Sequence, residues 1–110
     1  MTKITEVEEI SIEEVIDLVR NNEDIVLVDI RDPGSFELGH LPGAVHITDY
    51  NVESFLKETD REKLHVVYCY HGNSSLGGTA YFQTNGIKYA KSMSGGYTAW
   101  ERTYPDDVEK

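Results

Sequence analysis

The sequence contains a single cysteine, Cys69, among its 110 residues. One thiol cannot form a disulfide within the chain, and it cannot build a metal site from several thiolates. Long apolar runs are also absent, since no stretch approaches the roughly 20 residues of a membrane-spanning helix. The first ten residues carry three glutamates where an export signal would be basic and then apolar. We therefore expect a cytoplasmic protein with no membrane partner.

Basic residues are scarce, with ten Lys and Arg against twenty Asp and Glu and a net charge of −10. Such a surface repels phosphate backbones and anionic lipids, so we expect no nucleic-acid partner. Any anion site must be made locally, from backbone amides or a helix end. The composition has no biased run and is 39% hydrophobic, which predicts one globular domain over residues 1–110 with a core at about 4–104.

The spacing of apolar residues predicts alternating strands and helices. The continuous β-branched run at 25–30 indicates a buried strand covered on both faces, as in a parallel sheet. Ser11 and Glu14 form a capping-box pattern at the start of the first helix, and Asn51 is a candidate cap for a later one. The fold class is therefore α/β, with a mostly parallel sheet and helices on both faces. The expected strands are 4–10, 25–30, 44–47, 65–68 and 89–93, and the expected helices are 12–20, 33–38, 52–58, 75–85 and 97–102.

Cys69 stands at the end of the strand predicted at 65–68, ahead of a polar segment that leads into a helix. Taken alone, a single cysteine is more often an inert buried residue. Its position favours reactivity, because ligands of parallel α/β sheets bind outside the carboxyl ends of the strands. Unpaired amides at a helix N-terminus stabilise a thiolate and lower the pKa of the thiol. The sequence thus predicts a nucleophilic thiolate at this position.

Three segments of the sequence form a recognisable set. They are Cys69-Tyr70-His71-Gly72-Asn73-Ser74-Ser75 with Gly77, Val28-Asp29-Ile30-Arg31-Asp32-Pro33 with Phe36, Gly39-His40, Gly43-Ala44 and His46, and Gly95-Gly96-Tyr97 with Ala99-Trp100. Together they resemble the rhodanese family, and specifically its single-domain thiosulfate sulfurtransferases. The similarity extends over nearly the whole chain. It implies a five-stranded parallel sheet flanked by helices, and a catalytic Cys69 that carries sulfur as a persulfide.

The residues support the same chemistry. A Cys69 thiolate can attack the sulfane sulfur of thiosulfate, release sulfite and keep one sulfur as a persulfide. A second nucleophile, such as cyanide, a small thiol or a protein thiol, then removes that sulfur. This reaction requires neither a metal nor an organic cofactor. Main-chain amides of the loop are the candidate substrate-binding groups, from Tyr70, His71, Gly72, Asn73 and Ser74.

One position departs from the family pattern. Single-domain members carry a lysine directly after the two serines, whereas this chain has Leu76 there. No Lys or Arg occurs between Cys69 and Lys88. Attraction of the thiosulfate dianion would then depend on amides and the helix end, with help from His71 when its ring is protonated.

Two other functions remain open at this point. Related cysteine-loop domains act as phosphatases or arsenate reductases, but they clamp the oxyanion with an arginine, and Ser74 and Ser75 occupy the corresponding positions here. Alternatively, the domain is a non-catalytic or redox-sensing module, or a carrier of persulfide sulfur to a protein partner.

The other polar residues have simpler structural interpretations. Isolated histidines without paired spacing predict no metal site, and His71 fits a substrate contact and a loop-holding role equally. Asp29 and Arg31 suit an ion pair, and Asp32 suits a helix cap. Ser74 or Ser75 is expected to cap the following helix, Trp100 to lie in the core, and the acidic ends to be solvated tails. The isolated histidines are His40, His46 and His65, and the ends are Glu6, Glu8, Glu9, Asp106, Asp107 and Glu109.

Overall fold

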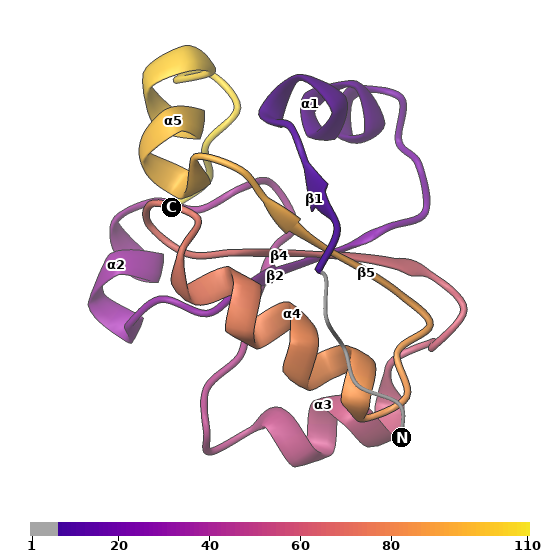
Figure 1. Cartoon of the computed structure of the whole chain (residues 1–110). Helices are drawn as coiled ribbons and strands as arrows, with labels where there is room; N and C mark the ends of the chain where they lie inside the picture. Colours follow the sequence, from indigo (N-terminus) through magenta and orange to yellow (C-terminus); the bar gives the residue numbers. More distant parts are fainter. Residues whose placement is uncertain (1–6) are drawn as a thin grey trace.

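The computed structural model, which describes residues 7–110, contains a five-stranded sheet with helices on both faces (Figure 1). The strand order is β1-β5-β4-β2-β3, and every neighbouring pair is parallel. This confirms the predicted fold class. The strands are β1 (Glu9–Ile10), β2 (Val26–Asp29), β3 (Val45–His46), β4 (Leu64–Tyr68) and β5 (Tyr89–Met93). The helices are α1 (Ile12–Arg20), α2 (Pro33–Leu38), α3 (Val52–Glu58), α4 (Ser74–Thr84) and α5 (Gly96–Thr103).

Two apolar clusters cover the two faces of the sheet. Successive side chains of a strand point to opposite faces, so Val66 and Tyr68 of β4 join one cluster while Val67 joins the other. The first cluster lies beneath α1 and α5, where Trp100 is fully buried as predicted. The second lies beneath α3 and α4 and includes Phe82. Both faces of the central strands are therefore shielded from water, which explains their continuous apolar sequence.

Most helix starts follow the sequence signals. The Ser11 hydroxyl accepts a hydrogen bond from the Glu14 amide at 3.1 Å, as the capping-box pattern predicted. Asp32 caps α2 by accepting from the Ser35 amide at 3.1 Å. Asn51 occupies the N-cap position of α3, but its side-chain oxygen accepts from the amide of Thr48 at 2.7 Å and does not cap the helix. The tight turn before α3 competes for that side chain.

The two chain ends differ from the expected pattern. β1 is shorter than the strand predicted at 4–10, and residues 4–6 lie outside the described part of the chain. Glu6 lies there as well.

The acidic C-terminal segment is not a solvated tail, so that prediction is wrong. Asp107 forms an ion pair with Arg20 at 2.8 Å, and its carbonyl accepts from the Trp100 indole. Glu109 forms a two-way backbone bridge with His40. Arg20 and His40 lie far away in the sequence, so no local pattern could have indicated these two contacts.

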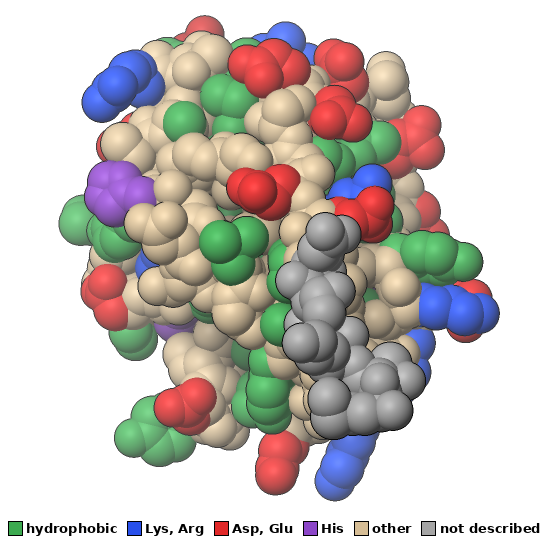
Figure 2. Space-filling view, viewed as in Figure 1, with side chains coloured by type: hydrophobic (Ala, Val, Ile, Leu, Met, Phe, Trp, Pro, Cys, Tyr) green, Lys and Arg blue, Asp and Glu red, His purple; other side chains and the backbone are tan. Residues whose placement is uncertain are grey.

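The surface carries its negative charge in a dispersed form. Acidic side chains are scattered over the face shown in Figure 2, with few Lys or Arg side chains among them. Within residues 7–110, no helix is both long enough and apolar enough to cross a membrane.

Candidate active site

Cys69 follows the last residue of β4, the middle strand of the sheet, and the next four residues turn the chain into α4. The turn is tight because Gly72 adopts a φ of +94°, a conformation that L side chains rarely tolerate. A side chain at Gly72 would also press on the backbone amide of Gly95, 3.1 Å from an added Cβ. The loop therefore wraps around the sulfur atom of Cys69.

Three hydrogen-bonding groups converge on the Sγ atom of Cys69. The amides of Gly72 and Ser75 donate to it, each at 3.2 Å, and the Ser75 hydroxyl lies 3.4 Å away. The Gly72 amide belongs to the predicted set of loop amides, whereas Ser75 was not counted among the binding residues. Ser75 lies in the first turn of the helix that follows the loop, where amides lack helical partners. That position could have identified its amide as a further donor to the sulfur.

Ser75 has a different role from the one predicted. Asn73, not a serine, occupies the N-cap position of α4, and it makes no side-chain capping bond. Ser75 is fully buried inside the first turn, and its hydroxyl lies 2.7 Å from the hydroxyl of Ser92 on β5. The expected serine cap is therefore wrong, because the hydroxyl of Ser75 is directed toward Cys69 and Ser92.

The surroundings of Cys69 favour the thiolate. Burial by itself raises the pKa of the thiol, but the hydroxyl and amide of Ser75 and the amides of Gly72 and His71 outweigh it, so the net pKa is lowered. The thiol is also buried, with only 7% of the residue exposed. A lowered pKa is typical of a nucleophilic cysteine, and the residue, although largely buried, lines a pocket that opens to the surface.

The start of α5 holds the loop from its other side. The amide of Tyr97 donates to the Cys69 carbonyl at 2.8 Å, and the amide of Thr98 donates to the Tyr70 carbonyl at 3.0 Å. This approach requires Gly96, which has a φ of +62° and would place a Cβ only 2.6 Å from the Cys69 carbonyl oxygen. The Gly95-Gly96 pair, part of the third segment that resembles the family, thus fixes the backbone of the reactive cysteine.

Arg31 forms the predicted ion pair with Asp29 and contacts the active-site loop through Tyr70. Its guanidinium lies 2.7 Å from the Asp29 carboxylate, with both side chains buried, and it also donates to the Gly39 carbonyl. The same group stacks on the ring of Tyr97 at 4.0 Å and on that of Tyr70 at 5.0 Å. The Arg31 guanidinium is therefore engaged in structural contacts and is not free to bind an anion as a bidentate donor.

The histidines fall into two groups. His40 stacks on Phe36, His46 hydrogen-bonds the Arg31 carbonyl, and His65 is buried against Thr59, which confirms their structural interpretation. His71 is exposed beside Tyr70 at the pocket. Among residues 7–110, no three His, Cys, Asp or Glu side chains come together in a way that could hold a metal ion.

A pocket of about 300 Å³ opens directly over Cys69. Four of the five predicted binding residues line it, and the fifth, Gly72, is buried within the loop. The opposite wall comes from the segment after β2. The lining residues are Ile30, Arg31, Asp32, Cys69, Tyr70, His71, Asn73 and Ser74.

A cysteine held by loop amides at the end of a parallel strand defines a class of α/β domain. Residues 11–103 match the Rhodanese-like domain family, so the chain belongs to that family. Among curated relatives, it is 40% identical over 101 residues to the thiosulfate sulfurtransferase GlpE of Pseudoalteromonas translucida (strain TAC 125). That alignment covers 92% of this chain and 95% of the relative.

Solved structures share the fold. The reduced CoADR-RHD protein of Bacillus anthracis superimposes with a TM-score of 0.80 at 20% identity, over 94% of this chain and 18% of that one. A protein of unknown function from Rhodopseudomonas palustris CGA009, described as a possible tyrosine phosphatase, gives a TM-score of 0.77 at 26% identity. In that case 94% of this chain and 95% of the other are covered.

Proposed function

We propose that the chain is a thiosulfate sulfurtransferase whose catalytic residue is Cys69. The observation that carries the proposal is the set of polar groups around one sulfur atom, namely the amides of Gly72 and Ser75, which donate to it, and the Ser75 hydroxyl 3.4 Å away, which can donate once the thiol is ionised. The similarity to a thiosulfate sulfurtransferase over most of both chains supports the same reaction.

In the first half-reaction the Cys69 thiolate attacks the sulfane sulfur of thiosulfate. A bond forms between Sγ and that sulfur, the bond between the two sulfurs of thiosulfate breaks, and sulfite leaves with the electron pair. The outer sulfur of the persulfide carries the negative charge. The amides of Gly72 and Ser75, which face Sγ, stabilise it as an oxyanion hole stabilises oxygen, and we infer that the neighbouring amides of Tyr70, His71, Asn73 and Ser74 contribute to the same site.

In the second half-reaction an acceptor removes the outer sulfur. Cyanide, a small thiol or a protein thiol attacks it, the Sγ–S bond breaks, and Cys69 returns to the thiolate. The persulfide is the only covalent intermediate, and the cycle uses neither a metal nor an organic cofactor. A free thiol that must cycle in this way suits a reducing compartment, so we place the protein in the cytoplasm.

The alternatives lack a supporting contact. A phosphatase or arsenate reductase clamps its oxyanion with an arginine, whereas the loop from Cys69 to Ser75 contains none and Arg31 is bound to Asp29. A passive or redox-sensing module does not require a thiolate supported by three donors. A persulfide carrier to a protein shares the first half-reaction and differs only in its acceptor.

Intact mass measurement tests the proposal. The reduced protein is incubated with thiosulfate without added reductant, beside a Cys69→Ser variant. A gain of one sulfur atom by the native chain alone, with release of one sulfite, is the expected result. No gain by folded, reduced protein would overturn the thiosulfate reaction, and hydrolysis of an aryl phosphate by the same sample would favour the phosphatase alternative.

A further inference from the structure

A second and larger pocket lies beside the one over Cys69. Its volume is about 500 Å³, within the range of about 300–1,000 Å³ that is usual for small-ligand sites. The two pockets share the residues that follow β2, namely Ile30, Arg31 and Asp32, so they adjoin one another. The function proposed above does not use this space.

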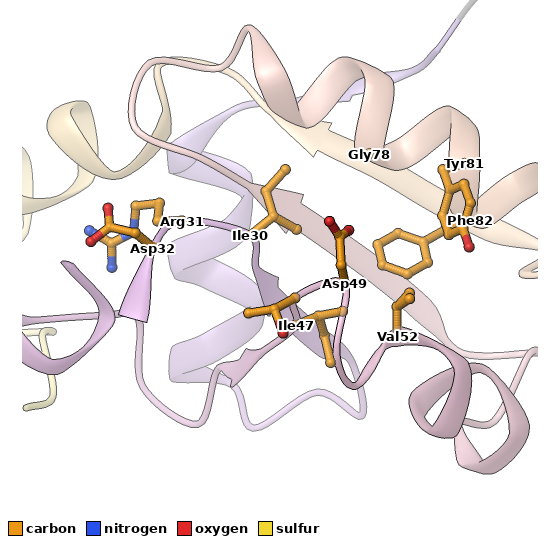
Figure 3. A pocket seen from close by; sticks show the side chains of 10 residues that line it. Ile30, Arg31, Asp32, Ile47, Asp49, Val52, Gly78, Tyr81 and Phe82 are labelled. Atoms are coloured by element: carbon orange, nitrogen blue, oxygen red, sulfur yellow. The ribbon is translucent and has the colours of Figure 1, made fainter. Parts of the chain in front are cut away.

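The walls of the second pocket are mainly aliphatic and aromatic. Ile30 and Ile47 directly follow β2 and β3, Val52 comes from α3, and Phe82 comes from α4 (Figure 3). Ile47 and Phe82 are themselves buried, which means that the floor is part of the packed core. A ligand that fills this space must therefore present apolar surface to it.

The exposed charged side chains that line the pocket are negative. Asp32 and Asp49 line it and are exposed, and Figure 3 shows the Asp49 carboxylate above the floor, between Ile30 and Phe82. Hydrogen bonds from the hydroxyl and amide of Ser35 lower the pKa of Asp32, so its carboxylate is ionised at neutral pH. The only cationic side chain in the lining is Arg31, whose charge is already balanced by buried Asp29.

We propose, on the basis of the sulfurtransferase function, that this pocket binds the non-reacting end of the sulfur acceptor, an alkyl thiol that ends in an ammonium group. The alkyl chain would lie on the apolar floor and the ammonium beside Asp49, which is separated from Asp32 by Ile30 in Figure 3. The thiol then reaches the neighbouring pocket over Cys69, which Asp32 also lines. An acceptor that ends in a carboxylate meets a like charge at Asp49 and is disfavoured.

The transfer is balanced without any further reagent. The acceptor thiol attacks the outer sulfur of the Cys69 persulfide, and a new sulfur–sulfur bond forms as the Sγ–S bond breaks. The electron pair of the broken bond goes to Sγ, and the proton of the acceptor thiol passes to the outer sulfur. The products are the acceptor's persulfide and the Cys69 thiolate.

The test compares three acceptors with one carbon skeleton, namely aminohexanethiol, mercaptohexanol and mercaptohexanoate. The end group is remote from sulfur, so the three thiols have similar intrinsic reactivity. The protein is loaded with thiosulfate and desalted, and loss of the extra sulfur is followed by quenched intact mass. We expect the amine to react roughly three- to tenfold faster than the carboxylate, with the alcohol between them, and the difference to shrink as salt is added.

Two variants locate the effect. Asp49→Asn should reduce the ratio of amine to carboxylate rates, and Asp49→Lys should invert it. Asp106→Asn, the same charge change at an exposed site outside the pocket, should leave the ratio unchanged. Because the readout is a ratio within each variant, a general change in persulfide reactivity cancels.

The outcomes separate the two proposals. Equal rates for the three acceptors, or a ratio that does not respond at Asp49, would overturn the acceptor pocket while leaving the sulfurtransferase intact. Failure of thiosulfate to load Cys69 would overturn the proposed function instead. In that case the persulfide is made chemically with inorganic polysulfide, and the same three thiols still decide whether the pocket selects by charge.

Discussion

The hydroxyls of Ser75 and Ser92 lie 2.7 Å apart in the buried space between α4 and β5. Ser75 also faces the Sγ atom of Cys69, so the two serines and the cysteine form a chain. When Cys69 is ionised, it can only accept, and the Ser75 hydroxyl must donate its single proton to it. Ser92 then donates to Ser75. The residue on β5 thus positions a proton for a sulfur that it does not touch.

The hydrogen-bonded series from Ser92 through Ser75 to Cys69 predicts that removing either hydroxyl raises the pKa of the thiol, by different amounts. Ser75→Ala deletes a direct hydrogen bond to the thiolate, and Ser92→Ala weakens it by removing its donor. Both changes should raise the pKa of Cys69 above the native value, Ser75→Ala more. A hydrogen bond to a charged group contributes about 1.5–3 kcal/mol, so Ser75→Ala should slow thiosulfate loading at neutral pH by about tenfold or more. The thiolate absorbance as a function of pH measures the pKa directly.

Thr79→Val is the matched control for the serine variants. Thr79 is fully buried in α4, and its hydroxyl donates to the Ser75 carbonyl at 2.7 Å without touching Cys69. Its loss should cost stability and leave the pKa of Cys69 in place. If Thr79→Val and Ser92→Ala shifted that pKa equally, the effect would come from helix packing and not from the hydroxyl chain.

The lowered pKa of Cys69 also predicts how stability depends on pH. The thiol has its ordinary pKa of about 9.0 when unfolded and a lower one when folded. Between the folded and the unfolded pKa, the unfolded state binds more protons, so the free energy of unfolding rises with pH. This contribution is complete above about pH 9.0, and it is lost as the pH falls below the folded pKa. Urea unfolding of the native chain and Cys69→Ala over a pH series should show a difference in unfolding free energy that grows toward pH 9.0. A constant difference would contradict a thiolate stabilised by the fold.

Local patterns in the sequence predicted the strands, the helix starts and the position of Cys69 at a strand end. The apolar run around Val28 and the capping pattern at Ser11 depend on neighbours within a few residues, and the structure confirms both. The place of Cys69 at the end of a strand followed from the same local patterns. Such features are encoded over one or two turns of chain, which is the distance over which periodicity and capping operate.

Contacts between distant segments could not be predicted in this way. The bridge from Glu109 to His40 and the pairing of Ser75 with Ser92 join residues that only the complete sheet brings together. A serine near the start of a helix predicts a cap from local sequence alone. Local sequence does not show that a cysteine and a second serine compete for its hydroxyl. The expected cap failed at Ser75 for that reason.

Gly96 is the position where the backbone support of the site is most sensitive. Gly96→Ala would place a methyl group against the Cys69 and Tyr70 carbonyls in a left-handed conformation. That conformation alone costs roughly 1–2 kcal/mol, and the clash adds to it. Gly77→Ala, in open space on α4, should instead stabilise by up to about 1 kcal/mol. Thermal or urea unfolding measures both, and a mild effect at Gly96 would mean that α5 does not clamp the loop.

The buried pair of Asp29 and Arg31 should be far more important to stability than the exposed pair of Arg20 and Asp107. Arg31→Met leaves a fully buried carboxylate without its partner, which costs about 3–5 kcal/mol. Adding Asp29→Asn to that variant should recover part of the loss, because the stranded charge disappears. Arg20→Met should change the unfolding free energy much less, since water screens that pair. Additive effects of the two buried substitutions in a double-mutant cycle would contradict the coupling.

Leu76 follows the two serines of the loop, at the position where single-domain relatives of the family pattern carry a lysine. The loop supplies amides and a lowered thiol pKa, yet no Lys or Arg lies between Cys69 and Lys88, and the net charge of −10 repels a dianion. Leu76→Lys would place a cation one residue after Ser75, at the start of α4. We expect the KM for thiosulfate to fall roughly three- to tenfold at low ionic strength, with kcat little changed and the gain reduced by salt. Thr84→Lys, at the exposed far end of the same helix, changes net charge equally and should lower KM much less. If the two lysines lowered the KM for thiosulfate equally, the change would come from overall charge. A lower KM in Leu76→Lys alone would show that a local cation strengthens a donor site otherwise built from backbone amides.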